Sequence, residues 1–352
     1  MIGSKKYVLS EEANNYYQTV SDLIDKTKYT HLTNPCGEIS LHARGGYCLI
    51  GDLVPFFCDS FDEIKETARL AARFLIRTNL MDSIYADEVK RTNRIGVSLT
   101  GIHEFAFKFF GYGFRDLIDE SKSQDFWNFL GELRGEVEIA ANNYSDLLGV
   151  NHPHTYTTIK PSGSVSKLFA LTEGAHLPAH KYYLRWVMFS NLTNEADKYK
   201  EQGYPVIPLV TYPNTSIVGF PTIPLITTLG MGDKLVTASE ATPEEQYQWL
   251  MLLEKYWLGE GNNQVSYTMK FKQDNVTLEE FRNTLIQYQS QIRCCSVMPE
   301  KGIDFLRSQY EYLPEEEVPQ NEFDSIVKHI KKRMDTVVTL EELQCSNGVC
   351  PM

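Results

Sequence analysis

The chain has 352 residues, of which 42% are hydrophobic, and a formal net charge of −12 at pH 7. This length and composition predict one large or two ordinary folded domains and exclude wholesale disorder. The acidic balance argues against a protein that binds double-stranded nucleic acid, because such proteins normally present a basic face. There is neither a bilayer-length apolar run nor a signal-peptide pattern in residues 1–17, so we expect no membrane association and a cytoplasmic location, or the host cytoplasm if a virus encodes the chain.

Helical and extended segments alternate along the chain, which indicates an α/β protein. Apolar periodicity and capping patterns predict helices at residues 10–27, 62–81, 123–148, 242–258 and 277–292. Residues 94–113 are predicted to form a short strand or turn and then a helix that ends at glycines. Short apolar runs predict strands at residues 215–221 and 262–271. The last residues, 340–352, have no periodicity and are predicted to form a tail.

The segment NPCGEISL, residues 34–41, carries an amide, a thiol and a carboxylate at alternate positions. Pro35 biases the residue before it toward an extended conformation, and alternate side chains of an extended segment point the same way. We therefore expect Asn34, Cys36 and Glu38 to share a face, with the thiol beside a possible base. From the spacing alone, a surface turn with a chance cysteine is an equal alternative, and no histidine stands at a same-face position to activate the thiol.

A second candidate site is the stretch TTIKPSGSVSKL, residues 157–168, which changes from β-branched residues to a loop and then to a helix start. Backbone N–H groups and hydroxyls at a helix N-terminus favour an anion. The residues that would supply them are Ser162, Gly163, Ser164, Val165 and Ser166. An ordinary serine-capped helix is the alternative, and because the Walker pattern is absent, nucleotide hydrolysis is not implied.

The seven cysteines do not resemble a disulfide framework, since we expect a reducing compartment. Cys58 and the Cys294–Cys295 pair fit the pattern of small buried hydrophobic residues. Cys345 and Cys350 bracket small residues near the C-terminus. From the residues alone they are exposed thiols or part of a zinc site, but the tail lacks the further ligands that zinc requires, so we predict no metal site in the protein itself.

Several motifs together resemble the ribonucleotide reductases, and the continuation after Glu38 is similar to the monomeric, adenosylcobalamin-dependent (class II) ribonucleoside-triphosphate reductases. The resemblance runs from about residue 31 to the end of the chain, and its motifs recur in the order of the family. They are NPCGEISL with GGYCLIGDLVPF, RIGVSLTGI, TIKPSGSVSKL, AHLPAHKYYLRWVMFS, NTSIVGFP, NNQVSYTMKF and CSNGVC.

The resemblance implies a fold, an activity and a cofactor. The fold would be the later part of the ten-stranded α/β barrel of these reductases, over residues 1–333, with a central finger loop at about residues 31–48. A flexible redox tail would follow at residues 334–352. The activity would be reduction of ribonucleotides, as triphosphates, to 2′-deoxyribonucleotides for DNA synthesis by a thiyl-radical mechanism. The cofactor would be adenosylcobalamin, which contains cobalt.

The resemblance also implies residue roles. Cys36 would be the thiyl-radical residue, Glu38 would accept the 3′-hydroxyl proton, and Asn34 would bind the ribose hydroxyls. Cys48 would be one of two reducing thiols, with Cys58 as second choice. Cys345 and Cys350 would pass electrons from thioredoxin or glutaredoxin. The loop of Ser162, Gly163, Ser164, Val165 and Ser166 would bind the substrate phosphates.

The sequence departs from the family in one respect: no cysteine precedes Cys36 to serve as the second reducing thiol. Family members carry a long region before the finger loop, so we expect this chain to require a separate N-terminal reductase polypeptide. Two alternatives stay open. One is a fragment of a diiron-dependent (class I) large subunit, and the other is a non-catalytic remnant that binds nucleotides or a partner.

Overall fold

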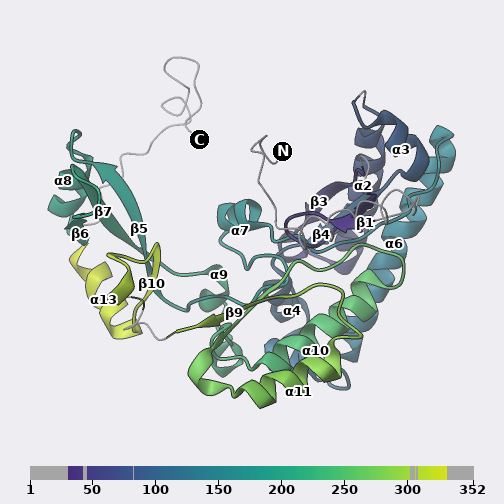
Figure 1. Ribbon diagram of the computed structural model, residues 1–352. Helices are drawn as coiled ribbons and strands as arrows, with labels where there is room; N and C mark the ends of the chain where they lie inside the picture. The colour runs from purple at the N-terminus through teal and green to yellow at the C-terminus, as the bar shows by residue number, and fades with distance from the viewer. Residues whose placement is uncertain (1–30, 43–45, 82, 302–305, 307, 331–352) are drawn as a thin grey trace, which may run out of the picture. The chain divides into compact units, whose positions relative to one another are not determined.

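The computed structural model describes residues 31–42, 46–81, 83–301, 306 and 308–330 of the chain (Figure 1). The described chain forms two compact units, one of residues 31–179 and 224–301 and one of residues 180–223 and 306–330. The helix predicted at 10–27 and the redox tail predicted at 334–352 lie outside the described residues, so both stay predictions. No described helix is long and apolar enough to cross a membrane.

The first unit is built on parallel extended segments. Its parallel strands are β3 (Leu49–Leu53), β4 (Ile95–Leu99), β8 (Thr268–Lys272) and β9 (Ser296–Glu300). β3 pairs with β4, and β8 pairs with β9. Residues 155–159 run between the two pairs, bridged in parallel to β4 on one side and to Val265, just before β8, on the other. The five segments therefore follow one another in the order β3, β4, 155–159, β8, β9, and the α/β class predicted from the sequence is confirmed.

Helices connect these parallel segments, as parallel pairing requires. The helices of the unit are α2 (Phe61–Asn79), α3 (Ala86–Thr92), α4 (Ile102–Phe110), α5 (Phe114–Ile118), α6 (Gln124–Leu148), α7 (Gly163–Phe169), α9 (Leu225–Thr228), α10 (Pro243–Leu253) and α11 (Leu278–Tyr288). Short 3₁₀ turns lie at Pro55–Phe57, Gly232–Lys234 and Gln273–Asn275. The helices predicted within 62–81, 94–113, 123–148 and 277–292 are confirmed. The one predicted at 242–258 changes at Glu254 into a π-helix, Glu254–Leu258.

The amphipathic pattern of α2 shows why these helices form where the sequence predicts them. The Ser60 hydroxyl accepts a hydrogen bond from the Glu63 N–H at 3.2 Å and caps the first turn. Apolar residues at helical spacing, among them Ile64, Ala68 and Ile76, are wholly buried. The face they form packs against α6 and the strands β3 and β4. The core of the unit also contains the fully buried side chains of Phe105, Phe126, Trp127, Trp249 and Trp257.

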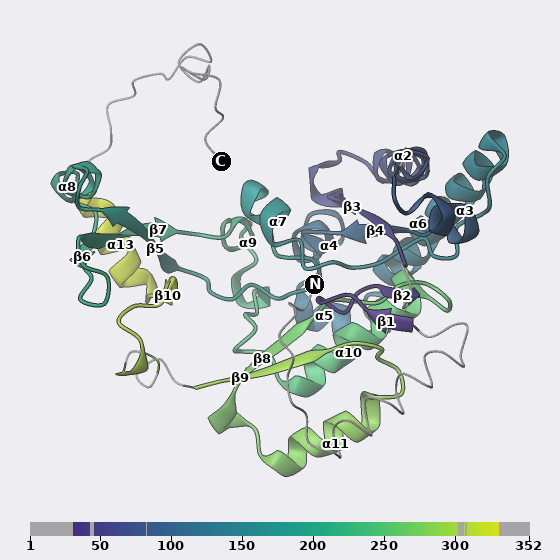
Figure 2. The same cartoon turned by 45° about the horizontal axis from the view of Figure 1, so that its top comes forward.

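A short antiparallel hairpin carries the NPCGEISL segment. Its strands are β1 (His31–Thr33) and β2 (Ser40–His42). Beyond the hairpin turn, the Glu38 carbonyl accepts the Gln264 N–H at 2.7 Å and the Thr158 hydroxyl at 3.3 Å. The loop is thereby fixed on segment 155–159 and on the residues just before β8, the third and fourth of the five parallel segments. Both views show the hairpin near β4 (Figure 1 and Figure 2).

The second unit has an antiparallel sheet of its own, in the order β10–β5–β7–β6. Its strands are β5 (Tyr183–Ser190), β6 (Val206–Pro208), β7 (Thr215–Thr222) and β10 (Glu315–Glu317), and its helices are α8 (Glu195–Glu201) and α13 (Gln320–His329). The strand predicted at 215–221 is β7. Trp186, Ile217 and Phe323 are buried in the core of this unit, and the indole N–H of Trp186 donates to Glu316 at 2.8 Å.

Candidate functional site

The loop at the tip of the β1–β2 hairpin is closed by Asn34. The Gly37 N–H donates to the Asn34 carbonyl at 3.0 Å, and the Ile39 N–H donates to the Asn34 side-chain Oδ1 at 3.1 Å. Pro35 occupies the second position of this turn, which its fixed φ favours, and Gly37 has a φ of +81°. The prediction of an extended conformation at residues 34–38 is therefore wrong, because the chain reverses direction in this turn. Cys36 is exposed at the tip, whereas Glu38 is buried.

The Glu38 side chain is the most unusual group of the loop. It is 3% exposed, and its Oε2 forms no hydrogen bond with any described residue. A buried carboxylate oxygen without a donor is unfavourable by about 1–3 kcal/mol or more. The position therefore suits a carboxylate that receives a hydrogen-bond donor, or a proton, from a bound molecule.

Three residues that bond to the loop or to the segments beneath it also have buried polar atoms without a partner: Asn263 Oδ1, Gln264 Oε1 and Arg94 Nε. Gln264 Nε2 donates to the Ser40 hydroxyl at 2.7 Å, and Arg94 Nη1 donates to the Ser40 carbonyl at 3.4 Å. Asn263 Nδ2 donates to the carbonyls of β4 and of segment 155–159, each at 3.1 Å. Native proteins leave few buried polar atoms unpaired, so this concentration indicates a place where a polar ligand binds.

Cys48, just before β3, is in contact with one of these residues. Asn263 Nδ2 lies 3.9 Å from its sulfur, and Thr155 also forms a hydrogen bond with it. Burial raises the pKa of the Cys48 thiol to about 12, and the nearby Glu38 charge acts in the same direction. The structure thus brings Cys48 near Glu38, as a protonated thiol. Cys58 is buried instead beside Thr67, and its sulfur lies 4.0 Å from the Thr67 hydroxyl.

A further cysteine, which the sequence analysis treated as core, also contacts the loop. A Cβ atom added to Gly37 would lie 2.3 Å from Cys294 Sγ. The next residue, Cys295, interacts instead with the Tyr247 hydroxyl and the core beneath β8, and burial raises the pKa of its thiol to about 11. Cys295 fits the expected buried residue, whereas Cys294 lies against the loop. No local sequence signal predicts this contact.

The serine-rich loop lies at the C-terminal end of segment 155–159, the end of a parallel sheet where ligands usually bind. Ser162 adopts a left-handed conformation, with a φ of +56°, and its hydroxyl donates to Asp52 Oδ1 at 2.6 Å. The other oxygen of Asp52 lies 3.0 Å from Lys160 Nζ. Asp52, which sequence reasoning did not select, therefore fixes the loop.

The five predicted phosphate-binding residues differ in exposure. Gly163 and Ser164 are exposed, Val165 is half-buried, and Ser162 and Ser166 are buried. The Ser166 N–H donates to the Ser162 carbonyl at 2.9 Å and begins α7. The N–H groups of the first helical turn have no intrahelical acceptor, so Gly163, Ser164 and Val165 are the ones that can donate to an anion.

His176 has a structural role. Its Nδ1 lies 3.0 Å from the Glu173 carbonyl, its Nε2 accepts the Thr268 N–H at 3.0 Å, and its ring stacks on Tyr267. Both ring nitrogens are thus used within the protein. Among the described residues, no group of three or more His, Cys, Asp or Glu side chains is arranged to bind a metal ion.

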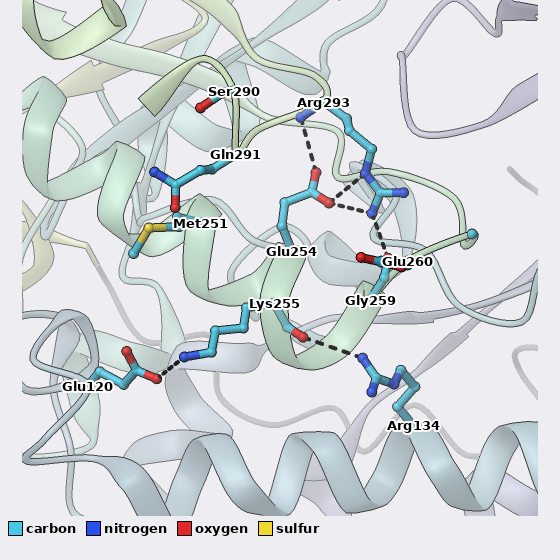
Figure 3. A pocket seen from close by; sticks show the side chains of 11 residues that line it. Glu120, Arg134, Met251, Glu254, Lys255, Gly259, Glu260, Ser290, Gln291 and Arg293 are labelled. Carbon is cyan, nitrogen blue, oxygen red and sulfur yellow. Dashed lines mark hydrogen bonds and ion pairs between the residues drawn. The ribbon is translucent and has the colours of Figure 1, made fainter. Parts of the chain in front are cut away.

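A hollow of about 980 Å³ lies at the opposite ends of the strands, where the chain enters β8 and β9 (Figure 3). Three cations line it, and each has a partner: Arg293 with Glu254, Lys255 with Glu120, and Arg134 with the Lys255 carbonyl. Because its charges neutralise one another and it contains none of the predicted site residues, this hollow is not the candidate active site.

Comparison with known proteins defines the class. No family model matches the chain. In fold, it resembles a crystal structure of a B12-dependent (class II) ribonucleotide reductase, with a TM-score of 0.71 and 24% identity over 88% of this chain and 43% of that one. The class Id ribonucleotide reductase α subunit of Actinobacillus ureae gives a TM-score of 0.50 and 14% identity, over 78% of this chain and 54% of the other.

The sequence relatives are more specific. The chain is 30% identical over 345 residues to the adenosylcobalamin-dependent ribonucleoside-triphosphate reductase of Lactobacillus acidophilus and 28% identical over 350 residues to that of Lactobacillus gasseri. Each match covers 91% of this chain and 45% of the relative, so the chain spans somewhat less than half the length of these enzymes. The resemblance to the ribonucleotide reductases found in the motifs is confirmed by these relatives, which match most of this chain.

Proposed function

We propose that this chain forms the finger-loop half of a ribonucleoside-triphosphate reductase, which replaces the 2′-hydroxyl of a ribonucleoside triphosphate with hydrogen. The observation that carries the proposal is the exposed Cys36 thiol on the same short loop as the buried Glu38 carboxylate, whose Oε2 has no hydrogen-bond partner. The names of the sequence relatives support the same activity.

The loop residues act in a defined order. A thiyl radical at Cys36 removes the 3′ hydrogen of the ribose, and Glu38 accepts the 3′-hydroxyl proton, which activates the 2′-hydroxyl to leave as water. Asn34 uses its Oδ1 within the loop, so its amide N–H₂ group donates to a ribose hydroxyl. The 3′ hydrogen then returns from Cys36 to the sugar.

The reaction needs two electrons and two protons from a pair of thiols, which become a disulfide as the 2′ carbon is reduced. Cys48 is one of them: its neutral thiol contacts Asn263 and lies near Glu38. In this proposal the second thiol comes from the N-terminal reductase polypeptide. Cys345 and Cys350, which lie outside the described residues, then pass electrons from thioredoxin or glutaredoxin to the disulfide.

Adenosylcobalamin, when bound, supplies the oxidising equivalent that generates the Cys36 radical. The exposed position of Cys36 fits a radical source that approaches the loop from outside. We assign none of the described residues to contacts with the corrin.

The substrate phosphates bind at the first turn of α7, through the N–H groups of Gly163, Ser164 and Val165. Asp52 fixes this loop through Ser162 and Lys160.

The remaining half of the barrel is a further part of the proposal. Within the described residues, β3 and β9 each pair with a single neighbour, and β9 exposes Val297 and Met298, at 40% and 44%. Parallel strands are normally covered on both faces, and an open edge invites pairing. The N-terminal reductase polypeptide, with its own barrel strands, is the partner we propose for these edges.

The test is co-expression of this chain with a polypeptide that carries the N-terminal half of such a reductase. We expect the two to co-purify in equal amounts and to form deoxyribonucleoside triphosphates only when adenosylcobalamin and thioredoxin are added. A diiron-dependent enzyme would be active without adenosylcobalamin, and a non-catalytic remnant would bind nucleotides without turnover. Either result would overturn the proposal.

A further inference from the structure

An arginine stands beside Cys48 where the chain enters the parallel strands. Leu49 pairs with Ile95 in the register of β3 and β4, and the Leu49 N–H donates to the Arg94 carbonyl at 3.2 Å. Cys48 and Arg94 therefore occupy neighbouring positions, each one residue before its strand. Paired strands lie about 4.8 Å apart, so the two residues are next to each other across the sheet.

The two side chains belong to the same face of the sheet. Residues two apart along a strand share a face, and the residues two positions further on are Ile50 and Gly96. A Cβ atom added to Gly96 would lie 2.8 Å from Ile50 Cγ2 and 3.3 Å from Asn263 Nδ2. The same Asn263 nitrogen lies 3.9 Å from the Cys48 sulfur, so Cys48 and Arg94 share the face on which Asn263 lies.

The guanidinium of Arg94 lacks an anionic partner. Its Nε is buried and forms no hydrogen bond with any described residue, and its Nη1 donates to the Ser40 carbonyl at a long 3.4 Å. Within the described chain it forms no ion pair, whereas the nearby Arg91 is paired with Glu88 at 2.8 Å. A half-buried cation without a counter-ion suits a site where negative charge forms during a reaction.

Among the described groups that act on the Cys48 thiol, only Arg94 carries a positive charge. Burial raises the pKa of this thiol to about 12, against the lowering effects of Thr155, Arg94 and Asn263, and the Glu38 charge acts in the same direction as burial. A thiol of high pKa is a poor leaving group when a disulfide is reduced. The Arg94 charge opposes the disadvantage that burial creates.

We propose that Arg94 stabilises the thiolate that Cys48 becomes when the active-site disulfide is reduced again. A thiolate of the reductant attacks the sulfur of the second cysteine, on the N-terminal polypeptide, and the bond from that sulfur to Cys48 breaks. The electron pair stays on the Cys48 sulfur, beside the guanidinium, until the second thiol of the reductant gives it a proton.

The second sulfur of the reductant then attacks the first and closes the disulfide of the oxidised reductant. The other active-site cysteine leaves as a thiolate and takes a proton from water. Two thiols of the reductant are thus oxidised as the two thiols of the active site are restored. The inference rests on the proposed role of Cys48 and adds a second residue to that step.

The first test needs no turnover and uses the full chain. Iodoacetamide alkylates thiolates, and peptide mass mapping follows the half-buried Cys48 separately from the other cysteines. At about pH 9 we expect Arg94→Met to slow alkylation of Cys48 several-fold, since the loss of thiolate outweighs the gain in nucleophilicity. Arg94→Lys, which keeps the charge, and the control Arg91→Met should react at nearly the wild-type rate.

A purely structural role of Arg94 would give the opposite result. If the side chain only held the strand entry together, Arg94→Met would expose Cys48 and speed its alkylation. Equal or faster alkylation in Arg94→Met would therefore overturn the proposal. Equal slowing by Arg94→Lys and Arg94→Met would also overturn it, because the effect would then not come from the positive charge.

The second test follows the proposed step in the complex with the N-terminal polypeptide. One turnover without reductant oxidises the active-site thiols, dithiothreitol is then added, and the reappearance of the free Cys48 thiol is followed by alkylation. We expect Arg94→Met to slow this reappearance several-fold and Arg91→Met to leave it at the wild-type rate. Equal rates in Arg94→Met and wild type would overturn the proposal.

Failure of the proposed function has a different signature, because wild-type complex would then form neither deoxyribonucleotide nor the active-site disulfide. In that case alkylation of the full chain decides alone whether the Arg94 charge stabilises the Cys48 thiolate.

Discussion

Gly37 connects the conformation of the finger loop to its chemistry. Its positive φ lets the chain turn after Cys36 and brings Glu38 into the interior, and its missing side chain leaves room for the Cys294 thiol. The sequence predicted Asn34, Cys36 and Glu38 as a group, because the motif is local. It could not predict the contact with Cys294, since that contact depends on where β9 begins in space.

Gly37→Ala should therefore destabilise the chain for two separable reasons. The positive φ is unfavourable for alanine by about 1–2 kcal/mol, and the added methyl group displaces the Cys294 thiol at a further cost of about 1–3 kcal/mol. In a Cys294→Ala background only the first effect should remain. Urea unfolding of the four proteins measures both, and identical losses in the two backgrounds would show that the thiol does not occupy this space.

His103 gives a pH-dependent prediction at the same scale. It is buried between Trp249 and Phe114, and burial lowers its pKa to about 4, below the value of about 6.5 for an unfolded chain. Between these values the unfolded chain binds a proton that the folded chain does not bind. Stability is thus fully present above about pH 6.5 and falls as the pH drops toward 4.

Replacing His103 by leucine should flatten this dependence. Between pH 7 and pH 5 we expect the free energy of unfolding of the wild type to fall by about 2 kcal/mol more than that of His103→Leu. Urea unfolding at the two pH values is the measurement. A variant whose stability changes with pH as much as the wild type would show that His103 is not responsible.

At the scale of elements, helices were predicted better than strand partners. The capping boxes at Thr242 and Thr277 are local, and the helices that begin there follow their patterns. The π-helix at Glu254–Leu258 was missed, because the helical periodicity of residues 242–258 does not distinguish an α-helix from a π-helix. The antiparallel sheet of the second unit was missed for a similar reason, since short apolar runs do not specify their pairing direction.

The Glu254–Arg293 pair gives the prediction for this scale. Arg293→Ala leaves the buried Glu254 carboxylate without its cation and should lower the free energy of unfolding by about 2–4 kcal/mol. Arg134→Ala, in the same hollow, is the matched control and should cost less than about 1 kcal/mol, because its contacts are exposed. Equal effects of the two substitutions would show that the pair does not anchor the strand entry.

For the whole molecule, the five parallel segments form the framework that carries both the finger loop and the serine-rich loop. The motifs predicted the α/β class, which agrees with the fold. The roles of Asp52 and of the unpaired polar atoms at and beneath the finger loop could not be predicted, because they arise where separate strands meet. Within the described residues, β3 and β9 each pair with a single neighbour, which supports the proposal of a second polypeptide that completes both barrel and dithiol.

The central claim is that Cys36 is the radical residue of a ribonucleotide reductase. Its most direct test is deoxyribonucleoside triphosphate formation by the complex with the N-terminal polypeptide, with adenosylcobalamin and thioredoxin present, for wild type, Cys36→Ser and the control Cys58→Ser. We expect product from wild type and Cys58→Ser, and at least a thousandfold less from Cys36→Ser, because a serine hydroxyl does not form the radical. Product formation by Cys36→Ser at the wild-type rate would contradict the account.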